Sequence, residues 1–372
     1  MTLPNDDITT GQTISLTPVL GASPYTFAAG LQITPINQIG VGEGRHIVFL
    51  GRDHQLDADF VYKRIPKASM PSPAEFFAEA RRLHESRHRH VVPVNYACET
   101  TDFVFVAMPH FSKGSLQSEM EKRMLTVREV VKLGLDFLMG LHHAHIRKVI
   151  HFDVKPNNIF LDNSDAAMLA DFGQSRIADM DGFAATPRMY PMHVPPEADT
   201  SSHLTRSADI YQAGLTLYRM CVGEHAWRRQ TAVYGDSLTS KFKDDLLRGR
   251  FPARAAFPEH IPTRLQNIIR RALKTKPEDR WNSVVDLMSA LASLENGPLD
   301  WQAEETADGG MAWSFSPDSS EVRISLEHDG SGKWSVEKNR VRPTQMRYRK
   351  DCLGQSSEPV ARQHVRALLK VS

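Results

Sequence analysis

Residues 151–173 read HFDVKPNNIFLDNSDAAMLADFG and bring four chemically active side chains into one short span: Asp153, Lys155, Asn158 and Asp171. One carboxylate can orient a hydroxyl nucleophile, while the amide and the other carboxylate can hold Mg²⁺ against a nucleoside triphosphate. The lysine can neutralise charge on a transferred phosphoryl group. A polar turn between two strands is the simpler alternative. The pattern D-x-K-x-x-N followed by D-F-G is rare by chance, however, so we favour phosphoryl transfer.

Length and composition limit the class of protein. The chain of 372 residues is long enough for two lobes or domains and a small additional module. Its net charge of +1 gives no overall attraction to nucleic acid or membranes. No apolar run is long enough to span a membrane, and the first residues lack the pattern of a secretion signal. The three widely spaced cysteines match neither a disulfide framework nor a zinc site, which predicts a cytoplasmic protein.

The pattern of apolar residues divides the chain into four parts. Residues 1–30 lack periodicity and are expected to form a flexible arm. Residues 31–108 contain strand-like runs around one helical stretch, and residues 112–296 are mostly helical. In residues 298–372, three strand-like runs (MAWSF, EVRISLEH and GKWSVEK) precede a helix-like run, which predicts a small α+β module.

The opening stretch closely resembles the catalytic and magnesium-binding loops of eukaryotic-type (Hanks-type) serine/threonine protein kinases. Further motifs follow in the family's order from about residue 32 to residue 292. The resemblance implies an α+β, bilobal protein-kinase-like fold over residues 31–296, with a small β-rich N-lobe (residues 31–108) and a helical C-lobe (residues 112–296). The small α+β module would follow this domain.

The resemblance also implies a role for each side chain of the opening stretch. Asp153 would be the catalytic base and Lys155 the contact to the γ-phosphate. Asn158 and Asp171 would bind Mg²⁺. Asp209, in the run ADIYQAG, matches the aspartate that anchors the backbone of the catalytic loop in this family.

The run IGVGEG resembles the family's glycine-rich loop over the ATP phosphates. Gly40, Val41 and Gly42 match its start, where backbone N–H groups approach phosphate oxygens closely. The third glycine is displaced, because Gly44 comes one residue early and Arg45 occupies its usual place. Such glycines also open dinucleotide-binding units, but here a predicted strand follows instead of a helix.

Two more motifs complete the expected ATP site. Lys63 in FVYK resembles the lysine that binds the α- and β-phosphates, and Glu79 in the predicted helix EFFAEARRL resembles its ion-pair partner. The run FVFVAMPHF resembles the hinge that binds adenine. There Met108 would border the pocket, Pro109 would offer its C=O and Phe111 its N–H.

The expected activation segment departs from the family pattern. Phe152 replaces an arginine that helps to bind a phosphate on this segment, so we hypothesise that activity does not depend on its phosphorylation. The motif PPE, ending at Glu197, implies a buried ion pair with Arg280. Thr186 resembles the start of the substrate-positioning loop but lies several residues too far from Glu197, because of the insertion MYPMHV, residues 189–194.

The sequence therefore predicts a serine/threonine kinase that transfers the γ-phosphoryl group of Mg-ATP to a protein hydroxyl. Two alternatives stay open: a pseudokinase scaffold that binds a partner through residues 298–372, and a kinase-like phosphotransferase for small molecules. The displaced glycine and Phe152 favour the scaffold, whereas the presence of every expected catalytic residue opposes it. The PPE and PEDR motifs oppose the small-molecule enzyme.

One basic run and two histidine-rich runs each have a simple structural interpretation and a functional one. The run KNRVRPTQMRYRK, residues 338–350, could contact nucleic acid or an acidic partner, although a solvated strand edge is the more common meaning. The runs HESRHRH and HHAH lack the spacing of a zinc site, so we expect solvated or core histidines there.

Overall fold

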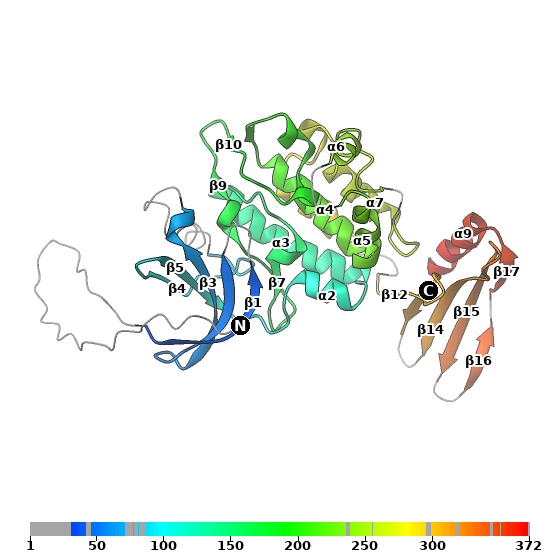
Figure 1. The fold of residues 1–372 in the computed structure, drawn as a ribbon. Helices are drawn as coiled ribbons and strands as arrows, with labels where there is room; N and C mark the ends of the chain where they lie inside the picture. Colours follow the sequence, from blue (N-terminus) through cyan, green and yellow to red (C-terminus); the bar gives the residue numbers. More distant parts are fainter. Residues whose placement is uncertain are drawn as a thin grey trace, which may run out of the picture. The chain divides into compact units, whose positions relative to one another are not determined.

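The computed structural model of the protein describes residues 31–41, 46–70, 77, 81, 87–235, 239–254, 256–294, 299–316, 320–342, 345–349 and 351–370. The chain divides into two compact units (Figure 1). The first comprises residues 1–71 and 95–110, and the second comprises residues 72–94 and 111–372. Glu79, Gly42 and Gly44 lie outside the described residues.

The first unit contains one antiparallel sheet of five strands in the order β1-β2-β3-β5-β4. The strands are β1 (Ile33–Val41), β2 (Ile47–Asp53), β3 (Ala58–Pro66), β4 (Tyr96–Glu99) and β5 (Phe103–Pro109), with a short 3-10 helix η1 (Lys67–Ser69) after β3. Tyr62 of β3 stacks on Phe49 and packs with Ala107 in an apolar cluster. Because successive side chains alternate between the faces of a strand, Lys63 points to the opposite face.

The second unit begins with a helical lobe. Its helices are α2 (Leu116–Lys122), α3 (Val127–Ile146), α4 (Ser207–Val222), α5 (Glu224–Ala232), α6 (Ser240–Leu247), α7 (Thr263–Ala272) and α8 (Val284–Ala292). A capping box of Thr126 and Glu129 begins α3. Every residue of α4 from Ala208 to Val222 is buried, so α4 is a core helix of this lobe.

Short paired strands connect these helices. The pairs are β6 (Val149–Ile150) with β9 (Arg176–Ile177), β7 (Ile159–Leu161) with β8 (Ala167–Leu169), and β10 (Ala184–Ala185) with β11 (His203–Leu204). The 3-10 helices are η3 (Pro156–Asn158), η4 (Phe172–Gln174), η5 (Pro191–His193), η6 (Pro196–Asp199) and η7 (Pro277–Asp279). The catalytic stretch identified in the sequence, residues 151–173, thus follows β6, forms η3 and the β7–β8 hairpin, and enters η4.

A C-terminal module, running from β12 to α9, completes the second unit. Its elements are β12 (Gln302–Glu305), β13 (Met311–Phe315), β14 (Glu321–His328), β15 (Trp334–Arg342), β16 (Gln345–Arg349), β17 (Leu353–Ser356) and α9 (Glu358–Leu369). The sheet is antiparallel in the order β12-β13-β14-β15-β16, and β17 pairs with β15. The three strands expected from the sequence are present, and three more that the sequence analysis missed extend the sheet.

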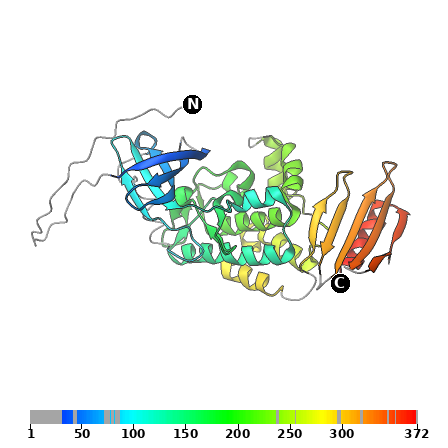
Figure 2. The same ribbon diagram turned by 90° about the horizontal axis from the view of Figure 1, so that it is seen from below.

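Helix α9 covers one face of this sheet (Figure 2). In β14, Val322, Ile324 and Leu326 are buried, whereas Glu321 and Arg323 are exposed. This alternation turns one apolar face toward α9, whose Ala361, Val365, Leu368 and Leu369 belong to the same buried cluster.

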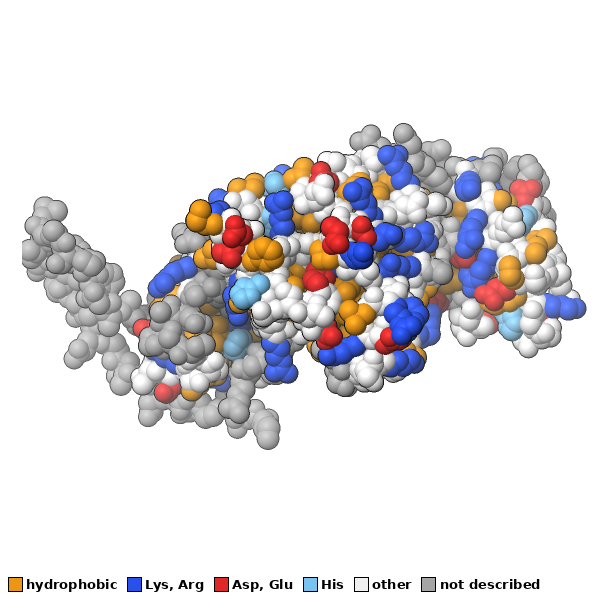
Figure 3. All heavy atoms as spheres, turned by 90° about the horizontal axis from the view of Figure 1, so that it is seen from above, with side chains coloured by type: hydrophobic (Ala, Val, Ile, Leu, Met, Phe, Trp, Pro, Cys, Tyr) orange, Lys and Arg blue, Asp and Glu red, His pale blue; other side chains and the backbone are white. Residues whose placement is uncertain are grey.

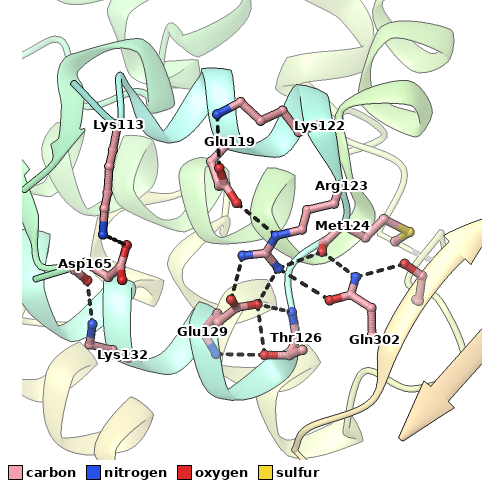
Figure 4. A network of polar contacts seen from close by, with 11 residues as sticks. Lys113, Glu119, Lys122, Arg123, Met124, Thr126, Glu129, Lys132, Asp165 and Gln302 are labelled. Carbon is pink, nitrogen blue, oxygen red and sulfur yellow. Dashed lines mark hydrogen bonds and ion pairs between the residues drawn. The ribbon is translucent and has the colours of Figure 1, made fainter. Parts of the chain in front are cut away.

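Residue Arg123, in the loop between α2 and α3, ties the helical lobe to β12 (Figure 4). Its guanidinium donates to the carboxylates of Glu119 and Glu129 and, at 3.4 Å, to the side-chain oxygen of Gln302. Gln302 in turn donates to the carbonyl of Met124 at 2.8 Å. The Met124 side chain packs against the apolar cluster of the module.

Two buried side chains just before α7 make a second contact with the module. His260 Nδ1 accepts a hydrogen bond from Trp313 Nε1 at 3.1 Å. The Glu259 carboxylate accepts from Arg362 Nη1 of α9 at 2.9 Å. The module is therefore joined to the helical lobe by buried polar contacts as well as by apolar packing.

Charged side chains of both signs are interspersed on the face seen in Figure 3, as expected for a chain with a net charge of +1. Among the described residues, no helix has the length and apolar character that a membrane span requires.

Candidate active site

The structure brings together three of the side chains predicted for catalysis. Asn158 Nδ2 donates to Asp153 Oδ2 at 2.7 Å and to the Asp153 carbonyl at 2.9 Å. Lys155 Nζ lies 2.9 Å from Asp153 Oδ1. Asp153 and Asn158 are buried, with 5% and 7% of their surface exposed. The carboxylate of Asp153 is thus in contact with both an ammonium and an amide on the loop between β6 and β7.

The carboxylate of Asp209 shapes the start of this loop. It is fully buried and accepts the backbone N–H groups of His151 at 2.8 Å and Phe152 at 2.7 Å. His145 Nε2 lies 2.7 Å from the same carboxylate. Phe152 has a φ of 64°, in the left-handed region that residues with a side chain rarely adopt. The predicted anchoring role of Asp209 is confirmed by these contacts.

His151 connects the catalytic loop to the stretch before Asp171. Its Nε2 lies 3.1 Å from the carbonyl of Ala170, which can only accept, so Nε2 carries the proton. Its Nδ1 then accepts the backbone N–H of Asp153 at 3.2 Å. Burial lowers the pKa of His151, which favours this neutral form. The imidazole also packs against the buried Phe172 ring, with centroids 4.6 Å apart.

Asp171 is the N-cap residue that directly precedes η4, and it has a left-handed backbone conformation with a φ of 60°. Its Oδ1 accepts the backbone N–H of Gly173 at 3.3 Å. The backbone N–H of Ala170 donates to the carbonyl of Asn158 at 2.8 Å. The two residues predicted to bind magnesium, Asn158 and Asp171, therefore lie on directly hydrogen-bonded segments of the second unit.

The first unit carries five of the described residues that were predicted for ATP binding. Lys63 is buried in the middle of β3, opposite Val48 of β2 and Val106 of β5. Gly40 and Val41 end β1, and Met108 and Pro109 end β5, which places these pairs at strand termini. Phe111 belongs to the second unit, where its ring lies 5.7 Å from that of Phe160.

The ion pair predicted at the end of the activation segment is present. Arg280 donates to both oxygens of Glu197, at 2.7 and 2.6 Å. The guanidinium is fully buried and also donates to the carbonyls of Lys274, Thr275 and Ser207. Every side of this charge therefore has a partner, as a buried arginine requires.

Phe152 occupies an apolar pocket where the family pattern has an arginine. It is fully buried in a cluster with Ala184, Met189, Leu204 and Ala208. Ala184 and Met189 belong to the activation segment, so apolar contacts hold that segment against the catalytic loop.

Among the residues that contact the catalytic loop, sequence reasoning missed Tyr190, His193, Gln212 and Thr216. The first two lie in the stretch treated only as an insertion. Gln212 accepts the backbone N–H of Val154 at 3.0 Å and donates to the carbonyl of Phe152 at 2.9 Å. A signal was available, since Asp209, Gln212, Thr216 and Arg219 are polar residues at helical spacing within an otherwise apolar run.

Comparison with known proteins finds similarity across the region that resembles a kinase. The family model described as "Protein kinase domain" matches residues 33–292. The L-type lectin-domain containing receptor kinase V.4 of Arabidopsis thaliana is 29% identical over 194 residues, which cover 50% of this chain and 30% of the relative. The serine/threonine-protein kinase Nek3 of Mus musculus is 24% identical over 206 residues, covering 54% of this chain and 38% of the relative.

A bacterial relative gives a longer match. The serine/threonine-protein kinase Pkn1 of Myxococcus xanthus is 27% identical over 248 residues, covering 64% of this chain and 34% of the relative. The chain thus spans only about a third of the length of these three relatives. The family match covers most of the chain and agrees with the five-stranded sheet and helical lobe of the structure. The chain belongs to the eukaryotic-type (Hanks-type) protein kinase family and has its bilobal α+β fold.

Proposed function

We propose that this protein is a serine/threonine kinase that transfers the γ-phosphoryl group of ATP to a protein hydroxyl. The observation that carries the proposal is the contact of Asp153 with both Lys155 and Asn158. A buried carboxylate held in this way can orient a substrate hydroxyl and accept its proton. The adjacent ammonium can neutralise charge on the transferred group.

The residues present fit a magnesium ion. Asn158 uses its amide nitrogen for two oxygen acceptors on Asp153, which assigns the amide orientation and leaves Oδ1 to act as a ligand. Asp171 supplies a carboxylate, the other oxygen ligand type that Mg²⁺ prefers. When bound, Mg²⁺ would neutralise charge on the ATP phosphates. Asn158 and Asp171 would hold it.

The remaining ATP contacts are proposed from the family pattern. Lys63 would bind the α- and β-phosphates with Glu79 as its partner, and the backbone of Gly40, Val41, Gly42 and Gly44 would cover the phosphates. Met108, Pro109 and Phe111 would receive the adenine. Serine/threonine specificity is supported by Lys155 and Pro156 of the loop and by relatives named serine/threonine-protein kinases. A cytoplasmic location and an acidic or nucleic-acid partner for residues 338–350 stay predictions.

The test is transfer of labelled phosphate from Mg-ATP onto the protein itself and onto a generic basic protein. We expect label on serine or threonine with the natural chain, and none with Asp153→Ala or Asp171→Ala. Asp165→Ala is the matched control, because this carboxylate lies on the exposed β7–β8 turn, where it pairs with Lys113 (Figure 4).

Two results would contradict the proposal. Binding of ATP by the natural chain, measured by thermal shift, without label in any sample would favour the pseudokinase scaffold. Label on small alcohols and none on proteins would favour the small-molecule phosphotransferase.

A further inference from the structure

The inserted stretch of the activation segment, Met189–Val194, reaches the catalytic loop with two side chains. The ring of Tyr190 lies 5.0 Å from Lys155 Nζ, within the range of a cation–π contact. His193 is fully buried, and its Nδ1 lies 3.2 Å from the carbonyl of Val154. Val154 is the residue between the catalytic Asp153 and Lys155, so this contact touches the peptide that joins them.

The neighbours of His193 define one tautomer. Its Nε2 lies 3.0 Å from Arg219 Nη1, and a guanidinium has only N–H donors, so Nε2 must accept. The proton therefore lies on Nδ1, where it faces a carbonyl that can only accept. Arg219 is fixed in turn, since its Nη2 donates to Glu224 at 2.9 Å and to Gln117 at 2.5 Å.

The charged groups around the imidazole favour its neutral form. Burial and the cationic Arg219 and Lys155 hold the pKa of His193 well below its usual range. The carboxylate of Glu224 binds the far side of Arg219. The rings of Tyr190 and Trp227 lie 5.9 and 6.0 Å from the imidazole and supply no charge.

The backbone N–H and the carbonyl of Val154 are both hydrogen-bonded. Its N–H donates to Gln212 Oε1 at 3.0 Å, and its carbonyl accepts from Thr216 Oγ1 at 3.3 Å as well as from His193. Gln212 Nε2 also donates to the His193 carbonyl at 3.3 Å. Gln212, Thr216 and Arg219 are spaced along one face of α4, which therefore serves as the base for this arrangement.

We propose that His193 is a positioning residue for phosphoryl transfer. Its neutral imidazole holds the Val154 carbonyl and so fixes the placement of Asp153 relative to Lys155. This inference rests on the proposed kinase function. Displacing reacting groups by about 1 Å can cost on the order of a hundredfold in rate, so loss of this hydrogen bond is expected to lower kcat.

Two amide replacements test the roles of the two imidazole nitrogens separately. His193→Asn keeps an N–H donor near the place of Nδ1, and His193→Gln keeps an acceptor near the place of Nε2. We expect kcat within about threefold of the natural value for His193→Asn and a loss of about tenfold or more for His193→Gln. The KM for ATP should stay within about twofold in both. Equal kcat in all three proteins, or the reverse order, would overturn the inference.

A matched control removes the effect of general destabilisation. His260→Gln alters another buried histidine whose Nδ1 is hydrogen-bonded, but its partner Trp313 lies in the C-terminal module. We expect a loss of thermal stability with unchanged kcat. A natural chain without any phosphoryl transfer would refute the proposed function, whereas transfer that His193→Gln leaves unchanged would refute only the role of His193.

A second measurement tests the tautomer of His193 and does not depend on kinase activity. Nitrogen NMR of the natural protein with labelled histidine should include an imidazole signal protonated at Nδ1 and bare at Nε2 that is missing from the spectrum of His193→Asn. A proton found on Nε2, or an ordinary pKa of about 6.5 for this residue, would contradict the inference.

Discussion

The carboxylate of Asp209 accepts the backbone N–H of Phe152 at 2.7 Å, and Phe152 holds a φ of 64°. A left-handed backbone costs a residue with a side chain roughly 1–2 kcal/mol. A hydrogen bond to a buried carboxylate is about twice as strong as a neutral one and offsets this strain. A core helix therefore imposes the backbone conformation that begins the catalytic loop.

Asp209→Asn should destabilise the protein and lower its activity. The amide nitrogen would face backbone N–H groups, which leaves at least one buried donor without an acceptor and costs about 2–4 kcal/mol. Urea unfolding measures this loss. Asp136→Asn is the control, because Asp136 Oδ2 accepts only the N–H of Ala167 among backbone donors of the described residues, at 3.1 Å, and should cost about 1 kcal/mol. Equal losses in both variants would contradict the special role of Asp209.

Phe152→Arg should not create a functional phosphate site. The side chain lies in an apolar cluster with Ala184, Met189 and Leu204, where an unpaired guanidinium would cost about 3 kcal/mol or more. We expect a lower unfolding free energy and weaker phosphoryl transfer. Phe152→Leu keeps the cluster apolar and should cost only about 1 kcal/mol. A stable, fully active Phe152→Arg protein would show that the cluster does not hold the activation segment.

Phosphatase treatment should leave the activity of the natural chain unchanged. The activation segment is already held by apolar packing around Phe152, and Thr186 Oγ1 donates to the carbonyl of Ser201 at 3.1 Å. Thr186→Ala should therefore retain most activity, measured as initial rate on a protein substrate. Loss of activity after phosphatase treatment, with recovery when Thr186 is phosphorylated, would refute this expectation.

Arg362→Gln should loosen the C-terminal module. Glu259 is almost fully buried and accepts from Arg362 at 2.9 Å, so removal of the guanidinium leaves a buried carboxylate with a weaker partner. Because Arg362 is itself partly exposed, we expect a loss of about 1–3 kcal/mol in unfolding free energy. Arg128→Gln breaks an exposed ion pair with Asp300 and should cost less than about 1 kcal/mol. A larger loss of unfolding free energy in Arg128→Gln than in Arg362→Gln would contradict the greater importance of the ion pair between Arg362 and Glu259.

His260 should make the protein less stable in mild acid. Burial lowers its pKa to about 4, and the indole N–H of Trp313 needs its Nδ1 as an acceptor. Between pH values of about 6.5 and 4 the unfolded chain binds the proton and the folded chain does not, so the unfolding free energy falls as the pH falls. The full contribution, present above about pH 6.5, is at most about 3 kcal/mol.

Urea unfolding at about pH 7 and about pH 4.5 measures this dependence. His260→Gln has no titrating imidazole at this position. Its unfolding free energy should therefore decrease less between the two pH values than that of the natural protein, by up to about 3 kcal/mol. An identical decrease in both proteins would show that His260 is not protonated on unfolding in this range.

Local sequence patterns were sufficient to predict much of this protein. The catalytic stretch, the strand-rich and helical regions, and the ion pair of Glu197 with Arg280 follow from motifs whose spacing is set by the chemistry or by helix and strand periodicity. Those patterns also predicted three strands and the closing helix of the module. They missed β12, β16 and β17, because short strands at a sheet edge have weak periodicity and gain their stability from pairing.

The sequence by itself determined which groups are available for chemistry: Asp153, Lys155, Asn158 and Asp171 stand in one short span. Only the tertiary structure decided how they are held. The contacts of Asp209, Gln212 and His193 with the catalytic loop join residues far apart in the chain. Hydrogen bonds of this kind form only when a particular helix face packs against a particular loop in the core. Local residue patterns do not specify which helix face packs against which loop.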